Sequence, residues 1–169
     1  MTPEDLLAIL NSCFCEALAA GPNPPSQCCV LASEPQITDC CAGVAWTRVL
    51  NIYPSNNFPA ADAKPDRCLP PSWAMTVQLG IFRCAPATCA AMDNPCCDSH
   101  ADAVTQQFAD RSAMLQSALC CLPNAVRQIE HFSMDRVVLG TWAVIETEGV
   151  CVGSSINVTI QFADPCVCP

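Results

Sequence analysis

The sequence is poor in charge, poorest of all in basic residues, and it contains no long apolar run. Charged residues make up only 14% of its 169 positions, and seven Lys and Arg stand against sixteen Asp and Glu, giving a net charge of -9. The cations are scattered, so we expect no sequence-specific nucleic-acid binding, which needs clustered positive charge. Without an apolar run of roughly 18 residues, we expect no membrane span. Acidic Glu4 and Asp5 do not fit a secretory signal, so we expect synthesis in the cytoplasm.

Signatures of catalysis and cofactor binding are also missing. There is no glycine-rich phosphate loop or dinucleotide fingerprint, and neither His100 nor His131 accompanies a hydrolase-type Ser or Cys motif. A Cys/His zinc set could be drawn from Cys96, Cys97, His100, Cys120 and Cys121. Zinc sites, however, tend to show two separated Cys-x-x-Cys pairs, and the sequence has none. We therefore expect no catalytic residue, no cofactor and no metal.

Cysteine, in contrast, is abundant, with sixteen residues. That density is typical of disulfide scaffolds in oxidising compartments. The candidates for disulfide bonds are Cys28, Cys29, Cys40, Cys41, Cys68, Cys84, Cys89, Cys96, Cys97, Cys120, Cys121, Cys151, Cys166 and Cys168. Bonding within an adjacent doublet is improbable, so each member is expected to reach a distant partner or stay free. Reduced thiols and metal ligation are the alternatives.

Two helices are predicted. Thr2 as N-cap, followed by Pro3, begins a helix over 3–19. Ser99 is the expected N-cap of a second helix over 99–122, which Pro123 should end. Its apolar stripe is expected at Val104, Phe108, Arg111, Leu115, Leu119 and Leu122.

Alternating apolar residues predict strands over 43–53, 73–82, 137–146 and 154–163. In the first of these, one face should carry Val44, Trp46, Leu50 and Ile52. Strands that follow one another without crossover helices favour an antiparallel sheet. The prediction is an α+β fold: a single domain, 1–169, with an antiparallel sheet of about four or more strands and both helices on one face.

Three segments rich in Cys and Pro connect these elements: 21–42, 54–71 and 84–98. The second is long and stiffened by proline, and ordering it in a monomer would cost entropy without return. We therefore expect Tyr53, Pro54, Phe58 and Pro59 to belong to a loop that contacts another subunit. The high hydrophobic fraction, 51%, also favours association between copies.

Several short motifs resemble tail terminator-like proteins of phages that infect actinobacteria. They are Cys41-Ala-Gly-Val-Ala-Trp46-Thr-Arg48, Tyr53-Pro-Ser-x-x-Phe58-Pro, Arg83-Cys84-Ala-Pro86, Cys120-Cys121, Leu139-Gly140-Thr-Trp142 and Gly149-Val-Cys151-Val-Gly153. The resemblance covers roughly 40–163, and the amino-terminal helix agrees in pattern only.

The resemblance implies a structural virion protein at the head-tail junction, not an enzyme. Its copies would form a ring, expected to be hexameric, that terminates the tail tube and joins it to the head connector. An acidic lumen would let DNA pass without sticking. Such a protein is made in the host cytoplasm and then works outside the cell, which accommodates the cysteines. A neck or head-completion protein of the same particle is the nearest alternative; a secreted disulfide-rich binding module and an enzyme follow.

Overall fold

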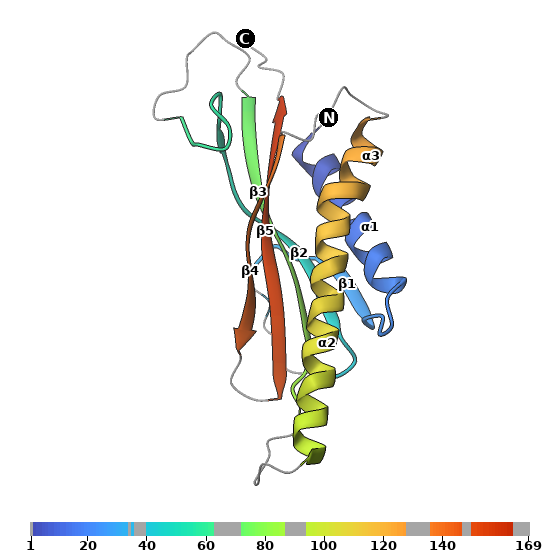
Figure 1. Cartoon of the computed structure of the whole chain (residues 1–169). Coiled ribbons are helices and arrows are strands. Elements are labelled where there is room, and N and C mark those ends of the chain that lie inside the picture. Colours follow the sequence, from blue (N-terminus) through green and yellow to red (C-terminus); the bar gives the residue numbers. More distant parts are fainter. Residues whose placement is uncertain are drawn as a thin grey trace.

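The computed structural model describes residues 2–33, 35, 40–62, 72–86, 94–127, 136–146 and 150–163, apart from the side chains of 94–97 and 146. The elements follow in the order α1 (Pro3–Ala19), β1 (Gln27–Val30), β2 (Val44–Pro54), β3 (Ser72–Cys84), α2 (Asn94–Gln116), the π-helical segment η1 (Ser117–Cys121), α3 (Leu122–Arg127), β4 (Val137–Glu146) and β5 (Cys151–Ala163). Figure 1 shows a twisted sheet with α1 and α2 side by side against one of its faces. The predicted α+β fold, with both helices on one face, is confirmed.

The sheet has five strands in the order β1-β2-β3-β5-β4. The four predicted strands are all present, and they pair antiparallel with one another. The predicted antiparallel pairing is confirmed for these four strands, and a fifth strand, β1, pairs parallel to β2, so the sheet is mixed. This strand lies within 21–42, which the sequence analysis treated as irregular. With only four residues, β1 shows no alternation, and its pairing with β2 defines it.

Helix α1 has the predicted bounds because its ends are set locally. The Thr2 hydroxyl accepts a hydrogen bond from the Asp5 amide, and the Asp5 carboxylate accepts one from the Thr2 amide. This reciprocal pair satisfies two amide groups that the first turn leaves without helical partners. The helix ends at Ala19, just before Gly21 and Pro22.

Helix α2 departs from the predicted bounds at both ends. It begins at Asn94 and not after Ser99, and Pro95 fits the first turn, where its missing amide proton costs nothing. At the other end, the chain passes through η1 and continues as α3, so Pro123 does not end it. Pro123 is again in a first turn, that of α3. Among the described residues, no helix is both long and apolar enough to cross a membrane.

The core lies between the two helices and the face of the sheet that they cover, here called the helix face. Its largest fully buried side chains are Leu6, Leu10, Phe14, Met75, Leu79, Ile81, Met114, Leu122 and Ile160. The predicted stripe of α2 was partly wrong, since Val104 and Phe108 are exposed. The helix instead turns Asp110, Ala113 and Met114 inward. Burial of Asp110 is possible because it is paired, as described below.

The opposite face of the sheet, here called the loop face, holds a smaller apolar cluster. Trp46 and Phe82 stack with their ring centroids 4.6 Å apart, beside Cys40 and Cys151. Gly80 lies beneath the indole, where a Cβ atom would collide with it. Further along the same face, the row of side chains becomes polar.

Three hydrogen bonds connect that polar row across the strands. The Arg48 Nε donates to Gln78 Oε1 over 2.7 Å, and Gln78 Nε2 donates to Ser155 Oγ over 3.3 Å. The hydroxyls of Thr76 and Thr159 lie 3.1 Å apart. On the loop face, hydrogen bonds thus join neighbouring strands, whereas on the helix face apolar side chains pack against the helices.

The expectation that Val44, Trp46, Leu50 and Ile52 share one face was wrong. The register of β2 against β3 shifts between Val49 and Asn51, which marks a β-bulge. Because a bulge inserts one residue, it reverses which face the following side chains take. Ile52 therefore pairs with Met75 on the helix face, whereas Trp46 lies on the loop face.

Candidate functional site

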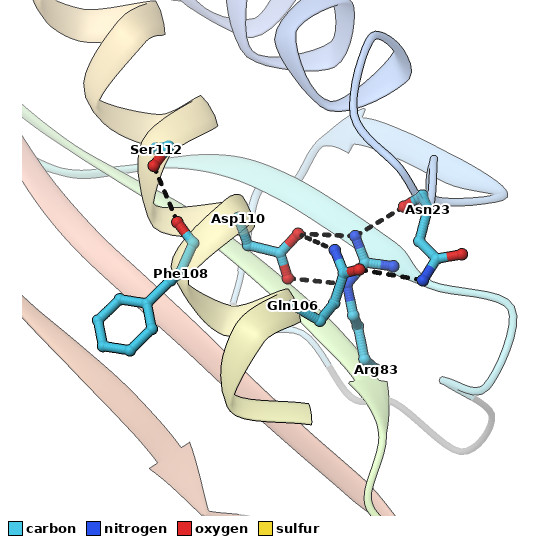
Figure 2. Close-up of polar contacts among 6 residues, drawn as sticks. All are labelled: Asn23, Arg83, Gln106, Phe108, Asp110 and Ser112. Carbon is cyan, nitrogen blue, oxygen red and sulfur yellow. Dashed lines mark hydrogen bonds and ion pairs between the residues drawn. The ribbon is translucent and has the colours of Figure 1, made fainter. Parts of the chain in front are cut away.

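The strongest polar arrangement in the described part of the chain is an ion pair between β3 and α2. Arg83 Nε donates to Asp110 Oδ2 and Arg83 Nη2 to Asp110 Oδ1, each over 2.7 Å. The geometry is bidentate, with two parallel bonds joining the guanidinium to the carboxylate, as Figure 2 shows. Asp110 is only 2% exposed.

Two further residues extend this pair into a network. Gln106, one turn before Asp110, donates to its carboxylate over 3.0 Å. Asn23, in the connection between α1 and β1, donates to Gln106 Oε1, and its carbonyl accepts from Arg83 Nη2 over 2.9 Å (Figure 2). The network thereby fastens three parts of the chain that are distant in sequence: β3, α2 and the segment after α1.

A hollow of about 450 Å³ adjoins the network on the side of residues 41–42 and 84–86. Its polar lining comes from Asn23, Arg83, Ser99, Asp102 and Gln106. Two further lining residues, Cys41 and Cys84, are bonded to each other, so neither offers a thiolate. His100, the described histidine, is exposed on α2 and is not part of the lining. Among the described lining residues, neither a histidine nor a cysteine thiolate accompanies the Ser99 hydroxyl and the Asp102 carboxylate.

A second, smaller cavity of about 50 Å³ lies between α2 and strands β3 and β5. Ser154 lines it, and its buried hydroxyl has no partner among the described residues. The volume suits one or two water molecules, with Arg83 and Asp110 also at the wall. The cavity is a place for buried water and is too small for an organic ligand.

Four disulfide bonds lie within the described residues: Cys13–Cys121, Cys15–Cys28, Cys40–Cys151 and Cys41–Cys84. Each bonded member of a doublet reaches a distant partner, and Cys29 and Cys120 are unpaired. The candidates Cys68, Cys89, Cys166 and Cys168 lie outside the described residues, as do the side chains of Cys96 and Cys97.

The sequence analysis missed Cys13 and Cys15 as disulfide partners. Cys13 fits the apolar stripe of α1, where a small buried thiol is an ordinary core residue. Cys15 lies two residues further on, on another side of the helix, and it reaches Cys28 of β1. The short sequence separation could have indicated this pair, since only 13 positions separate Cys15 from Cys28.

Among the described residues, the structure separates Cys120 and Cys121 from His100. Cys121 is bonded to Cys13, and His100 is separated from Cys120 by most of α2. At 1.5 Å per residue, that separation is roughly 30 Å. In the described part of the chain, no group of three or more His, Cys, Asp or Glu side chains is placed to hold a metal ion.

The predicted subunit-contact loop is described as far as Asp62. Tyr53 Oη donates to the Pro59 carbonyl over 3.0 Å, and Ser55 Oγ donates to Ala60 over 2.7 Å. The Asp62 amide donates a hydrogen bond to the Pro54 carbonyl, which joins the two ends of the turn. Phe58 is half-buried and Pro59 is exposed. This part of the loop is a compact, internally bonded turn at the end of β2; its contact with a second subunit stays a prediction.

Exposed apolar side chains gather at the two opposite margins of the sheet. The first group, here called the β4 edge, consists of Val104, Phe108, Val138 and Val144. Phe108 is 57% exposed, and its ring stacks on Trp142 of β4 at 6.3 Å. The second group, here called the β2 edge, consists of Val30, Leu50 and Ile52. Of the large apolar side chains that are exposed, only Val150 among the described residues lies outside these two edges.

No family model matches the chain, and no curated protein matches it either.

Proposed function

We propose that this chain is a non-catalytic structural subunit whose copies form a ring at the head-tail junction of a phage. The observation that carries the proposal is the pair of apolar edges on opposite margins of one sheet. A subunit with two different apolar margins can bind the next copy head to tail. Such heterologous contacts generate a closed ring when the rotation between neighbouring subunits divides a full turn evenly.

The edge strand β4 adds to this argument. From Val137 to Ile145 it carries no charged residue, although it is the outermost strand of the sheet. Monomeric proteins usually protect such a strand with Lys or Pro, because its free amide and carbonyl groups can pair with another chain. Apart from the register irregularity between Leu139 and Trp142, β4 has none of these protections, as expected of a subunit that assembles through this edge.

The location in the particle is supported by the sequence. The short motifs between residues 40 and 163 resemble tail terminator-like proteins, and the net charge of -9 suits an acidic lumen through which DNA slides. In this role the ring terminates the tail tube and joins it to the head connector. The disulfides then form when the particle leaves the reducing cytoplasm.

The test is the mass and shape of the purified, full-length chain. Light scattering after size exclusion should give a homo-oligomer, expected as a hexamer, and electron microscopy should show closed rings. Mixing with purified tail tubes should place these rings at tube ends. A monomer at every concentration, with no binding to tubes, would reject the proposal.

The four disulfides favour a second candidate, a binding module that works outside the cell. Disulfides persist in oxidising environments, and they are dense in secreted domains. The same light-scattering measurement separates the two candidates, because a secreted module of this kind is expected to be monomeric.

A further inference from the structure

We infer that the ring is built by strand addition: β4 of one copy pairs antiparallel with the β1–β2 margin of the next copy. This inference rests on the proposed ring and names the surfaces that form it. The partner is therefore a second copy of this chain, bound through two different margins.

The directions of the strands suit this contact. Strand β4 runs antiparallel to β5, β5 to β3, and β3 to β2, so β4 is antiparallel to β2. Strand β1 is parallel to β2 and therefore also antiparallel to β4. A rotation about an axis along the strands keeps every strand direction, so it brings β4 beside the β1–β2 margin in the antiparallel sense. The shared sheet would continue from copy to copy.

The two margins also match in length. Rows of paired residues cross the sheet, and the first row is Val137, Ile160, Met75 and Ile52. The row near the other end is Ile145, Gly153, Phe82, Val44 and Gln27. Val137 and Ile52 therefore belong to the same row and lie at the same height along the strands, and so do Ile145 and Gln27. Residues at the same height are called level with each other. Strand β4 spans the same rows as the margin formed by β1 and the last part of β2.

The helix layer continues in the same way. Helix α1 packs on β1, β2 and β3, and α2 packs on β3 and β5. Over β4, Phe108 of α2 reaches Trp142, yet Val144 on the same face is 44% exposed. In the proposed contact, Val144 is level with Cys28 of the next copy, whose α1 lies over that strand. The neighbour's α1 would therefore cover the exposed side of β4.

Charge complementarity supports the same register. Arg136 directly precedes Val137, so it is level with Tyr53 in the row beyond Ile52. Asp62 lies at this end of β2, because its amide donates to the Pro54 carbonyl over 2.9 Å. The cation of one copy thus lies within about one row of the Asp62 carboxylate of the next, which also accepts a hydrogen bond from the Asn56 amide over 2.7 Å.

The experiment uses one substitution on each margin. Val144→Glu places a carboxylate on the β4 edge, facing the acidic α1 of the neighbour, and Ile52→Lys places a cation level with Val137, one row from Arg136. Each should weaken self-association about 100-fold, because an unpaired charge becomes buried. Val150→Glu and Val150→Lys are the matched controls, since Val150 is exposed but lies on neither margin. The readouts are the oligomeric mass by light scattering and the thermal unfolding midpoint of each variant.

The decisive step mixes the two variants. Each is expected to be monomeric alone, whereas the mixture should form a heterodimer and nothing larger, because one intact β4 edge meets one intact β2 edge. The heterodimer also proves that both variants are folded. Loss of assembly in Val144→Glu alone would overturn the inference in favour of symmetric β4–β4 pairing. Rings unaffected by both substitutions would overturn this interface and leave the ring standing, whereas a monomeric wild type would overturn both.

Discussion

The two faces of the sheet are held by different kinds of interaction. On the helix face, two regular helices cover the strands, and a large cluster of fully buried Leu, Ile, Met and Phe side chains fills the space between them. On the loop face, the apolar cluster is small, single polar contacts join neighbouring strands, and a disulfide fixes the segment at Cys40. Two of the four described disulfides and the Arg83–Asp110 pair also lie on the helix side, so the two faces differ mainly in how much apolar surface they bury.

The largest expected effect tests burial on the helix face. Phe14→Ala should lower the free energy of unfolding by about 3–5 kcal/mol, because Phe14 is fully buried and its loss leaves a cavity. Phe108→Ala removes the same side chain from an exposed position of α2 and should cost about 1 kcal/mol, mainly its stacking on Trp142. Urea unfolding of both variants measures the difference. Equal losses would contradict the assignment of the core to this face.

The polar contact on the helix face should be nearly as sensitive. Arg83→Met leaves the buried Asp110 carboxylate without its cation, and removal of one partner of a buried pair costs about 3–5 kcal/mol. The double variant Arg83→Met/Asp110→Leu removes both charges and should recover much of that loss. A double-mutant cycle by urea unfolding checks this. If Arg83→Met alone left the free energy of unfolding unchanged, the two charges would not form a buried ion pair. Arg111→Met, on the same helix, is the control.

Two disulfides allow a comparison between the faces at almost equal loop length. Cys13–Cys121 spans 108 positions on the helix side, and Cys40–Cys151 spans 111 positions on the loop face. Because closure entropy depends on loop length, replacing either pair by alanine should cost a similar amount, about 2–4 kcal/mol.

The local effect of the two replacements should differ. Without Cys40–Cys151, amide hydrogen exchange should accelerate at Cys41 and Gly43, because little apolar surface holds that segment. Without Cys13–Cys121, α1 should keep its protection through its buried side chains. Faster exchange across α1 would show that the disulfide, and not burial, fixes this helix.

The smallest effect concerns pH and the start of α1. The pKa of Asp5 is lowered from its ordinary value of 3.8, chiefly by the hydrogen bond from the Thr2 amide and then by the Thr2 hydroxyl. A carboxylate whose pKa is lowered by folding stabilises the native state above its unfolded pKa, and that stabilisation is lost as pH falls through the folded pKa. The Thr2 amide should therefore lose protection below about pH 4. Asp5→Asn should abolish this step in an NMR titration, and Glu4→Gln should retain it.

The elements that could be predicted are those whose signals are local in the chain. Helix α1 could be predicted residue by residue because the Thr2–Asp5 cap and the Gly21-Pro22 stop act over a few positions. Strands β2, β3, β4 and β5 could be predicted from side-chain alternation, and the helix–sheet layering followed from their order. The exclusion of adjacent cysteine pairs followed from local geometry in the same way.

Features that depend on distant partners could not be predicted and emerge from the folded chain. Strand β1 exists through its pairing with β2, and the bulge after Val49 moves Ile52 to the face opposite Trp46. The inward face of α2 is set by Asp110, whose burial requires Arg83 from another element. Cysteine connectivity and the two apolar edges likewise depend on which chain segments meet. Local propensities fix the periodicity of an element, but its register, its buried face and its partners are set by long-range packing that one sequence window does not contain.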